Sequence, residues 1–214
     1  MRDILVTVDG ELTTLYVGKG IRVRISPKRF VLELSNHSLH RMIGEAVAEA
    51  ILPPFEVLRD PACGGDQRIP LFSSDEKSRR SEYCNVDLLV LSPDGIEVIV
   101  EIEEADVTPI QVFGKFLASA LSRCFIHQRE KNARIGMSDS VLFIQVLDTS
   151  KLRKDKTSKM QQWRNIEHSI EDVIPIKGSR ANHYRLFHGD TGDFAPGQAK
   201  RKELIDCIRA LLEN

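Results

Sequence analysis

Long apolar runs are missing from this sequence, and none approaches the roughly 20 residues that a membrane-spanning helix needs. The first residues, MRDILVTVDGELTT, are interrupted by Arg2, Asp3 and Asp9, so they lack the apolar stretch of a secretory signal peptide. We therefore expect a soluble, cytoplasmic protein with no membrane partner. With 214 residues, of which 42% are hydrophobic, the chain can build one good core but not two full-sized domains.

Several motifs of metal and nucleotide chemistry are missing too. The four cysteines, Cys63, Cys84, Cys124 and Cys207, form no CxxC pair, so we expect reduced thiols and neither a structural zinc nor a disulfide framework. The glycine-rich segments match neither a Walker A loop nor a dinucleotide-binding fingerprint. No GxSxG motif of a serine hydrolase occurs. These absences argue against the common nucleotide-binding and acyl-transfer enzymes.

An overall excess of positive charge is also lacking, since the formal net charge is -1, but the charges are unevenly distributed. One segment is acidic and contains no lysine or arginine: Asp87, Asp94, Glu97, Glu101, Glu103, Glu104 and Asp106. A later segment is basic apart from Asp155: Lys151, Arg153, Lys154, Lys156, Lys159 and Arg164. Carboxylates beside basic flanks suit a site that holds a divalent cation and a polyanion together. The simpler interpretation of the basic run is a solvated surface.

Hydrophobic periodicity predicts the order of the elements. Alternating segments before residue 36 (ILVTV, LTTLYV, IRVRI and FVLEL) predict a β-meander, and helical spacing then runs from Leu39 to Ile51. A short strand at 55–58 and a long loop at 59–83 follow. The strands VDLLVL and IEVIVEIE flank Pro93-Asp94-Gly95, a helix runs from Thr108-Pro109 to about residue 123, and SVLFIQVL is a buried strand.

The remaining chain predicts a helix at 158–172, short strands at 173–176 and 184–187, and a closing helix at 198–212. We expect residues 1–36 to form an N-terminal β-meander packed on the core. Residues 37–214 are expected to form that core with a C-terminal helical extension, so that the whole is one compact domain.

The geometry of one predicted hairpin brings two carboxylates together. Pro93-Asp94-Gly95 fits a three-residue loop, which makes Ser92 face Ile96 and therefore sets Asp87 opposite Glu101 on one face. Glu103 follows on the same face, about 7 Å along the strand. Because both strands are otherwise apolar, carboxylates here are poorly hydrated and repel each other. A hard divalent cation with oxygen ligands would relieve this repulsion.

Asp87 followed by Glu101-Ile102-Glu103 resembles the motif of the PD-(D/E)XK nuclease superfamily, in its Glu-x-Glu variant. The resemblance spans about residues 39–147 and implies an α/β (α+β) fold. Its restriction-endonuclease-like core has the order α-β-β-β-α-β, with a mixed central sheet flanked by helices, here preceded by the β-meander. Two departures stand out: Asn85-Val86 precedes Asp87 where the family has proline, and Glu103 replaces the usual lysine.

The resemblance implies a metal centre of Mg²⁺, with Mn²⁺ able to substitute. Asp87, Glu101 and the backbone carbonyl of Ile102 would bind the ion, and Glu45 from the first core helix is a candidate further ligand or else an ordinary exposed glutamate. The group beside the attacking water stays open between two residues. Glu103 is one choice, as base or water-orienting group. Lys115 is the other, on the same helix face as Gln111.

The resemblance further implies a divalent-metal-dependent endonuclease that hydrolyses DNA phosphodiester bonds in restriction or repair, and a homodimer if both strands are cut. Basic residues outside the motif are the expected phosphate contacts: Lys77, Arg79, Arg80, Arg129, Lys151, Arg153, Lys154, Lys156, Lys159 and Arg164. Two alternatives remain: a catalytically inactive nucleic-acid-binding protein with this fold, and a protein-interaction module whose acidic hairpin binds a basic partner.

Overall fold

A computed structural model describes residues 2–8, 11–17, 37–127, 132–152 and 156–213 of the chain. The chain divides into two compact units, Met1–Leu34 and Ser35–Asn214, with a boundary close to the one expected at residue 36. In the first unit, β1 (Arg2–Val8) pairs with β2 (Glu11–Val17) as the antiparallel start of the predicted meander. The other two meander strands, predicted at 21–25 and 30–34, lie outside the described residues.

The second unit is α+β, as expected, and its described residues form a mixed sheet with four helices. The helices are α1 (Ser38–Ala50), α2 (Pro109–Ala120), α3 (Lys156–Glu171) and α4 (Ala199–Leu212). The strands are β3 (Glu56–Arg59), β4 (Ile69–Phe72), β5 (Glu82–Val86), β6 (Leu88–Ser92), β7 (Gly95–Glu103), β8 (Cys124–Ile126), β9 (Arg134–Asp148) and β10 (Ala181–Gly189).

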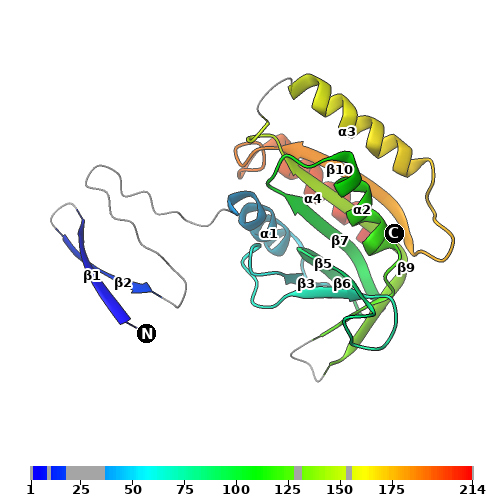
Figure 1. Ribbon diagram of the computed structural model, residues 1–214, viewed down its shortest axis with the longest axis horizontal. Helices are drawn as coiled ribbons and strands as arrows, with labels where there is room; N and C mark the ends of the chain where they lie inside the picture. The colour runs from blue at the N-terminus through cyan, green and yellow to red at the C-terminus, as the bar shows by residue number, and fades with distance from the viewer. Residues whose placement is uncertain (1, 9–10, 18–36, 128–131, 153–155, 214) are drawn as a thin grey trace. The chain divides into compact units, whose positions relative to one another are not determined.

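The strands form one sheet in the order β3-β6-β7-β9-β8-β4-β5, and β10 pairs with β9 outside this path (Figure 1). The β7–β9 and β9–β10 pairs are parallel, and the other pairs are antiparallel. The long strand β9 makes this possible because its first residues pair with β8 and its later residues with β7 and β10. Consequently β6, β7 and β9 are central strands.

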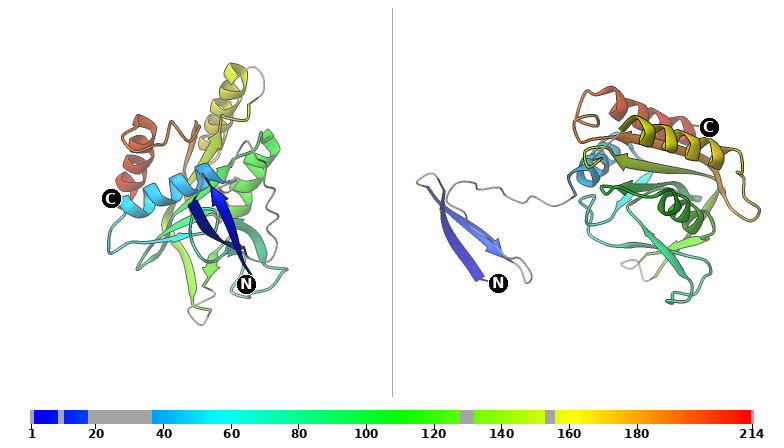
Figure 2. Two further views of the ribbon diagram at one scale, coloured as in Figure 1. Left: turned by 90° about the vertical axis from the view of Figure 1, so that its left-hand side faces the viewer. Right: turned by 45° about the horizontal axis from the view of Figure 1, so that its top comes forward.

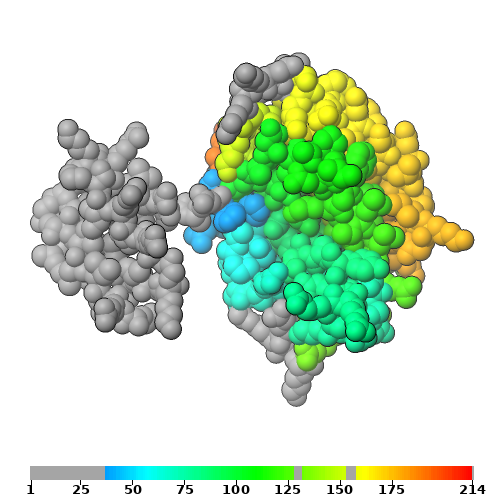
Figure 3. All heavy atoms as spheres, viewed as in Figure 1, coloured from blue at the N-terminus to red at the C-terminus, as the bar shows by residue number. Residues whose placement is uncertain are grey.

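Helices cover both faces of these central strands (Figure 2). On one face, α2 and α3 pack through Phe116, Trp163 and Ile170, and the two helices lie side by side on the surface (Figure 3). On the other face, α1 and α4 pack through Ile43 and Ile208. A strand covered on both faces needs apolar residues at every position, which explains the nearly unbroken runs in β6, β7 and β9.

Three short strands were missed by the sequence analysis. The predicted loop at 59–83 contains β4 and the start of β5, and β8 lies between α2 and β9, where no strand was predicted. Strand β4 was missed because it contains Pro70, and β5 because EYCNV has polar residues; proline and charge are depleted in strands. Conversely, the strand predicted at 173–176 is wrong, because the amides of Val173 and Ile174 donate to the Ile170 carbonyl at the end of α3.

The three-residue loop predicted at Pro93-Asp94-Gly95 is also wrong. Ser92 pairs directly with Gly95, which leaves a two-residue turn. A bulge at Glu97 then adds one residue to β7, so that Leu88 pairs with Val100. This is the register that the longer loop would have produced. At Leu88 the register therefore equals the predicted one, because the bulge makes up for the shorter turn.

The start of α2 follows its predicted signals. Thr108 is the N-cap and Pro109 the first helical residue, and Gln111 Oε1 accepts a hydrogen bond from the Thr108 amide at 2.8 Å in a capping box. The Gln111 side chain is thereby used by the cap, whereas Lys115, one turn later, is available to the sheet. Among the described helices, none is both long and apolar enough to cross a bilayer.

A substitution at Gly95 tests the close backbone contact at the hairpin turn, and one at Gly114 of α2 is its control. Gly95 has φ 147°, and a Cβ there would lie 2.6 Å from the Gly136 carbonyl oxygen, so we expect Gly95→Ala to lower the free energy of unfolding by about 1–3 kcal/mol. Gly114→Ala is the control: a Cβ on this exposed helical residue meets no atom within 4 Å. It should stabilise the protein by about 0.5–1 kcal/mol. Chemical denaturation measures both, and equal effects would contradict the close approach at Gly95.

Candidate functional site

The candidate site lies where β6 begins and β7 ends. Asp87 directly precedes β6, and its backbone is held on both sides: its amide donates to the Val100 carbonyl at 3.2 Å and its carbonyl accepts from the Asp60 amide at 2.9 Å. Leu88–Val100 is the last register pair of β6 and β7, so Asp87 lies just beyond it, and its charge acts on Glu101, the residue that follows Val100. The backbone geometry of the hairpin thus fixes the place of the first carboxylate.

The side chain of Asp87 is turned toward β7. Its Oδ2 accepts a hydrogen bond from the Ile102 amide at 2.6 Å, and only 16% of the side chain is exposed. Burial raises the pKa of Asp87, even though the hydrogen bond from the Ile102 amide and the charge of Lys115 lower it. The Ile102 amide is thereby engaged, and the role expected for its carbonyl stays a prediction.

Glu101 is the most deeply buried acidic group of the site, with a side chain that is 1% exposed. Its Oε2 accepts a hydrogen bond from Lys115 Nζ at 2.8 Å, but its Oε1 is buried and has no hydrogen-bond partner. Burial, followed by the charge of Asp87, raises the pKa of Glu101 to about 8. A buried carboxylate oxygen without a partner is rare in folded proteins and points to a missing ligand.

Lys115 reaches the sheet from α2 and lies between two carboxylates. Its Nζ is 2.8 Å from Glu101 Oε2 and 2.5 Å from Glu103 Oε1. Burial lowers the pKa of Lys115, but the two carboxylates outweigh it and hold that pKa well above its usual range. The two residues that the sequence left as alternatives, Glu103 and Lys115, are therefore neighbours in one site.

A histidine from α1 was missed by the sequence analysis. His40 is 9% exposed, its Nδ1 lies 3.0 Å from Glu104 Oε1, and its Nε2 lies 3.7 Å from Asp87 Oδ2. Glu45, the residue expected from this helix, is exposed, and it is His40 that α1 contributes beside Asp87. A search of α1 for acidic residues alone could not find it; the available signal was the pair His37 and His40 at helical spacing.

Glu104 explains why α1 begins at this edge of the sheet. The N-cap of α1 is His37, which makes no side-chain cap hydrogen bond. Glu104 supplies the cap instead, because its Oε1 accepts from the amides of Leu39 at 2.7 Å and His40 at 3.0 Å. Burial raises the pKa of Glu104, but the hydrogen bonds from His40 and Leu39 bring it below its ordinary value.

The same corner offers a set of metal-binding atoms. His37, His40 and Glu104 each present one ligand atom, and these atoms all lie within 4.8 Å of one another. Since His40 also faces Asp87, this group adjoins the Asp87–Glu101 pair. The corner therefore combines nitrogen and oxygen donors that a divalent metal ion could use.

The basic residues that were expected to contact phosphate differ in their surroundings. Lys159 Nζ donates to the Val107 carbonyl at 2.7 Å and pairs with Asp106 at 3.0 Å, so it ties α3 to the segment that follows Glu104. Lys77 donates to Asn132 Oδ1 at 2.8 Å. Four others are exposed: Arg79, Arg80, Lys151 and Arg164. Arg129, Arg153 and Lys154 lie outside the described residues, as does the side chain of Lys156.

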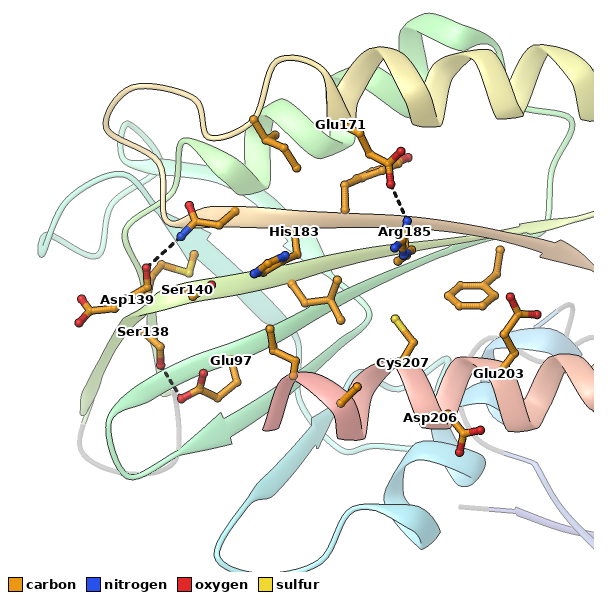
Figure 4. Close-up of a pocket in the computed structure, with 18 of the residues that line it drawn as sticks. Glu97, Ser138, Asp139, Ser140, Glu171, His183, Arg185, Glu203, Asp206 and Cys207 are labelled. Atoms are coloured by element: carbon orange, nitrogen blue, oxygen red, sulfur yellow. Dashed lines mark hydrogen bonds and ion pairs between the residues drawn. The ribbon is translucent and has the colours of Figure 1, made fainter. Parts of the chain in front are cut away.

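A wide groove lies away from this site. Its volume is about 1990 Å³, and it lies along β10 between α3 and α4 (Figure 4). Arg185 and Glu171 form an ion pair there at 2.5 Å. Asp87, Glu101 and Lys115 are not among its lining residues. A search for the functional site by groove volume alone would therefore not find the buried carboxylates.

In comparisons with known proteins, no family model, no curated protein and no solved structure matches the chain.

The raised pKa of Glu101 predicts how stability depends on pH in the metal-free protein. Between the ordinary value of 4.5 and about 8, the folded state holds a proton that the unfolded chain has released. Stability should therefore fall as the pH rises through this window, by at most about 1.4 kcal/mol per pH unit. Lys115 stays charged throughout because its pKa is raised.

Denaturation in EDTA at pH 5 and pH 8 measures this loss. Glu101→Gln should shrink it, whereas the control Glu97→Gln, at the other end of β7, should retain it. An equal loss in wild type and Glu101→Gln would show that Glu101 is not the group responsible.

Proposed function

We propose that the chain is a divalent-metal-dependent nuclease of the PD-(D/E)XK type that hydrolyses phosphodiester bonds in DNA. The observation that carries this proposal is the buried, unpartnered Oε1 of Glu101 beside Asp87 at the end of a central strand. A structural ion pair with Lys115 would account for Oε2 alone. A metal ion would give the remaining oxygen a partner and relieve the repulsion between the two carboxylates.

The element order supports the same proposal. Helix α1, strands β3, β6 and β7, helix α2 and strand β9 follow one another as helix, strand, strand, strand, helix, strand. Strand β6 lies between β3 and β7 and is antiparallel to both, and β9 is parallel to β7. Strands β4, β5 and β8 extend the sheet beyond this core. Fold alone does not establish an activity, so the proposal rests on the carboxylates.

The donor atoms fit a metal ion. Asp87 and Glu101 would hold it, together with His40. Since Nδ1 of His40 donates to Glu104, its Nε2 carries the lone pair and faces another acceptor, Asp87 Oδ2, at 3.7 Å. Two ligands of one ion, each about 2.1 Å from it, lie about 3–4 Å apart. A carboxylate behind a histidine is also the usual support for a metal-binding imidazole.

The site residues would divide the chemistry among them. The metal ion would supply an activated water and neutralise charge on the scissile phosphate. Lys115 stays protonated, so it cannot act as a base; its ammonium would hydrogen-bond the attacking water or a phosphate oxygen and stabilise the developing charge. Glu103, whose side chain is 17% exposed, is the carboxylate able to accept the proton of that water.

The surroundings favour a polyanionic substrate. Lys159 joins α3 to the segment after Glu104, and the sequence that precedes Lys159 is rich in lysine and arginine. Exposed lysines and arginines near a carboxylate-bound metal suit phosphate contacts on either side of the scissile bond. DNA is the substrate that the family resemblance favours, and a two-fold dimer is the simplest arrangement for cutting both strands.

A cleavage assay tests the function. With plasmid and oligonucleotide DNA in Mg²⁺ or Mn²⁺, we expect cleavage that EDTA stops and that Asp87→Asn and Glu101→Gln each lower by roughly 10²–10⁴-fold. Glu97→Gln, a carboxylate on the same strand but away from the site, should cleave like wild type. DNA binding without cleavage under any of these conditions would instead support the inactive nucleic-acid-binding alternative.

Metal affinity tests the role of His40. Because an imidazole ligand favours Mn²⁺ over Mg²⁺ relative to an all-oxygen site, His40→Gln should weaken Mn²⁺ binding by roughly 10–100-fold and Mg²⁺ binding less. Isothermal titration calorimetry measures both constants. The matched control is Glu45→Gln on the same helix, which should leave both unchanged. If the two variants bind Mn²⁺ equally well, His40 is not a ligand.

A further inference from the structure

Two polar residues lie in the apolar layer between the sheet and α2. Gln145 of β9 is fully buried, and Tyr184 of β10 is 2% exposed. Both belong to the face on which α2 and α3 pack, where most of the buried residues are apolar. Gln145 is moreover the register partner of Glu101 on the adjacent parallel strand. Polar side chains at such positions are retained only where their hydrogen bonds are satisfied.

The hydrogen bonds of this pair lead from β10 to α2. Tyr184 donates its hydroxyl proton to Gln145 Oε1 at 2.5 Å, and Gln145 Nε2 donates to the Val112 carbonyl at 3.3 Å. The Val112 carbonyl can only accept, so it fixes which end of the Gln145 amide faces the helix. The other end of that amide, Oε1, therefore faces Tyr184 and accepts its hydroxyl proton. The three groups form one directional chain of hydrogen bonds.

The aromatic ring of Tyr184 makes a second contact with α2. It packs edge-on against Phe116 with the ring centroids 5.3 Å apart, and Phe143 lies against both rings at 5.5 and 6.0 Å. Phe116 directly follows Lys115, and Val112 precedes it by three residues. The two contacts therefore hold α2 on both sides of the residue that carries the site's ammonium group.

We propose that Gln145 and Tyr184 are positioning residues that set the height and rotation of α2 on the sheet, and thereby bring Lys115 Nζ to Glu101 and Glu103. Hydrogen bonds suit this task better than apolar packing, because they are directional and fix rotation. The catalytic consequence rests on the proposed nuclease function. The effect on the position of Lys115 does not.

The test compares Gln145→Met and Tyr184→Phe with Ile170→Ala. The first two keep the side-chain volume nearly unchanged and remove hydrogen bonds, whereas Ile170→Ala opens a cavity in the same apolar layer without touching the hydrogen-bond chain. Thermal unfolding first gives a temperature at which all four proteins are folded. The Cε–Hε signals of Lys115, assigned by their loss in Lys115→Arg, then report the surroundings of its ammonium group in the full-length protein.

We expect Gln145→Met to shift the Lys115 signals and to lower kcat by roughly 10–100-fold with KM within about twofold. Tyr184→Phe should act in the same direction but less, and Ile170→Ala should change neither quantity. Lys115 signals in Gln145→Met that match those of wild type and Ile170→Ala would overturn the proposal, whatever the activity. A wild-type protein that never cleaves DNA would end the proposed function instead, and the Lys115 signals would still decide the role of Gln145 and Tyr184.

Discussion

The buried carboxylate of Glu101 is the constraint around which this structure is arranged. It lies on a central strand that is covered by helices on both faces, where water cannot solvate it. Lys115 of α2 forms an ion pair with Glu101, and Asp87, just before β6, lies near enough for its charge to act on Glu101. His40 of α1 in turn lies beside Asp87. These partners still leave Oε1 without a hydrogen bond. The proposed metal site rests on this unpaired oxygen, because a deeply buried acidic group costs stability unless its oxygens find partners.

Glu104, in the same corner, contacts both the backbone of α1 and a side chain of the candidate site. Its carboxylate caps α1, which holds this helix to the end of β7, and it also fixes the imidazole of His40. On the opposite face of the sheet, Gln145 and Tyr184 hold α2. The charged groups of the site are thus set by two helices, each tied to the sheet by buried polar contacts. Side chains held in this way need little reorganisation when charge develops between them.

The central strands, their covered faces and the presence of a turn at Pro93-Asp94-Gly95 could be predicted from the sequence, because the apolar runs and the turn residues are local signals. The details of that hairpin could not. The turn is shorter than predicted, and a bulge at Glu97, which no local signal marks, restores the register. His40 was missed for a similar reason: its role depends on Glu104, which is 64 residues away in the chain. Strands β4, β5 and β8 are too short to give a periodic signal, and they form by pairing with segments distant in the chain: β4 with β5 and β8, and β8 with β9.

A crystal structure of the protein grown with Mn²⁺ tests the central claim most directly, since anomalous scattering locates the ion without reference to activity. The account predicts an anomalous peak within coordination distance of Glu101 Oε1 and Asp87, with His40 Nε2 as a further ligand. A well-ordered site without such a peak, in which Glu101 keeps its bond to Lys115 and its Oε1 is bonded to a water or another protein group, would contradict it. The pair would then be a structural feature of an α+β domain rather than a metal centre.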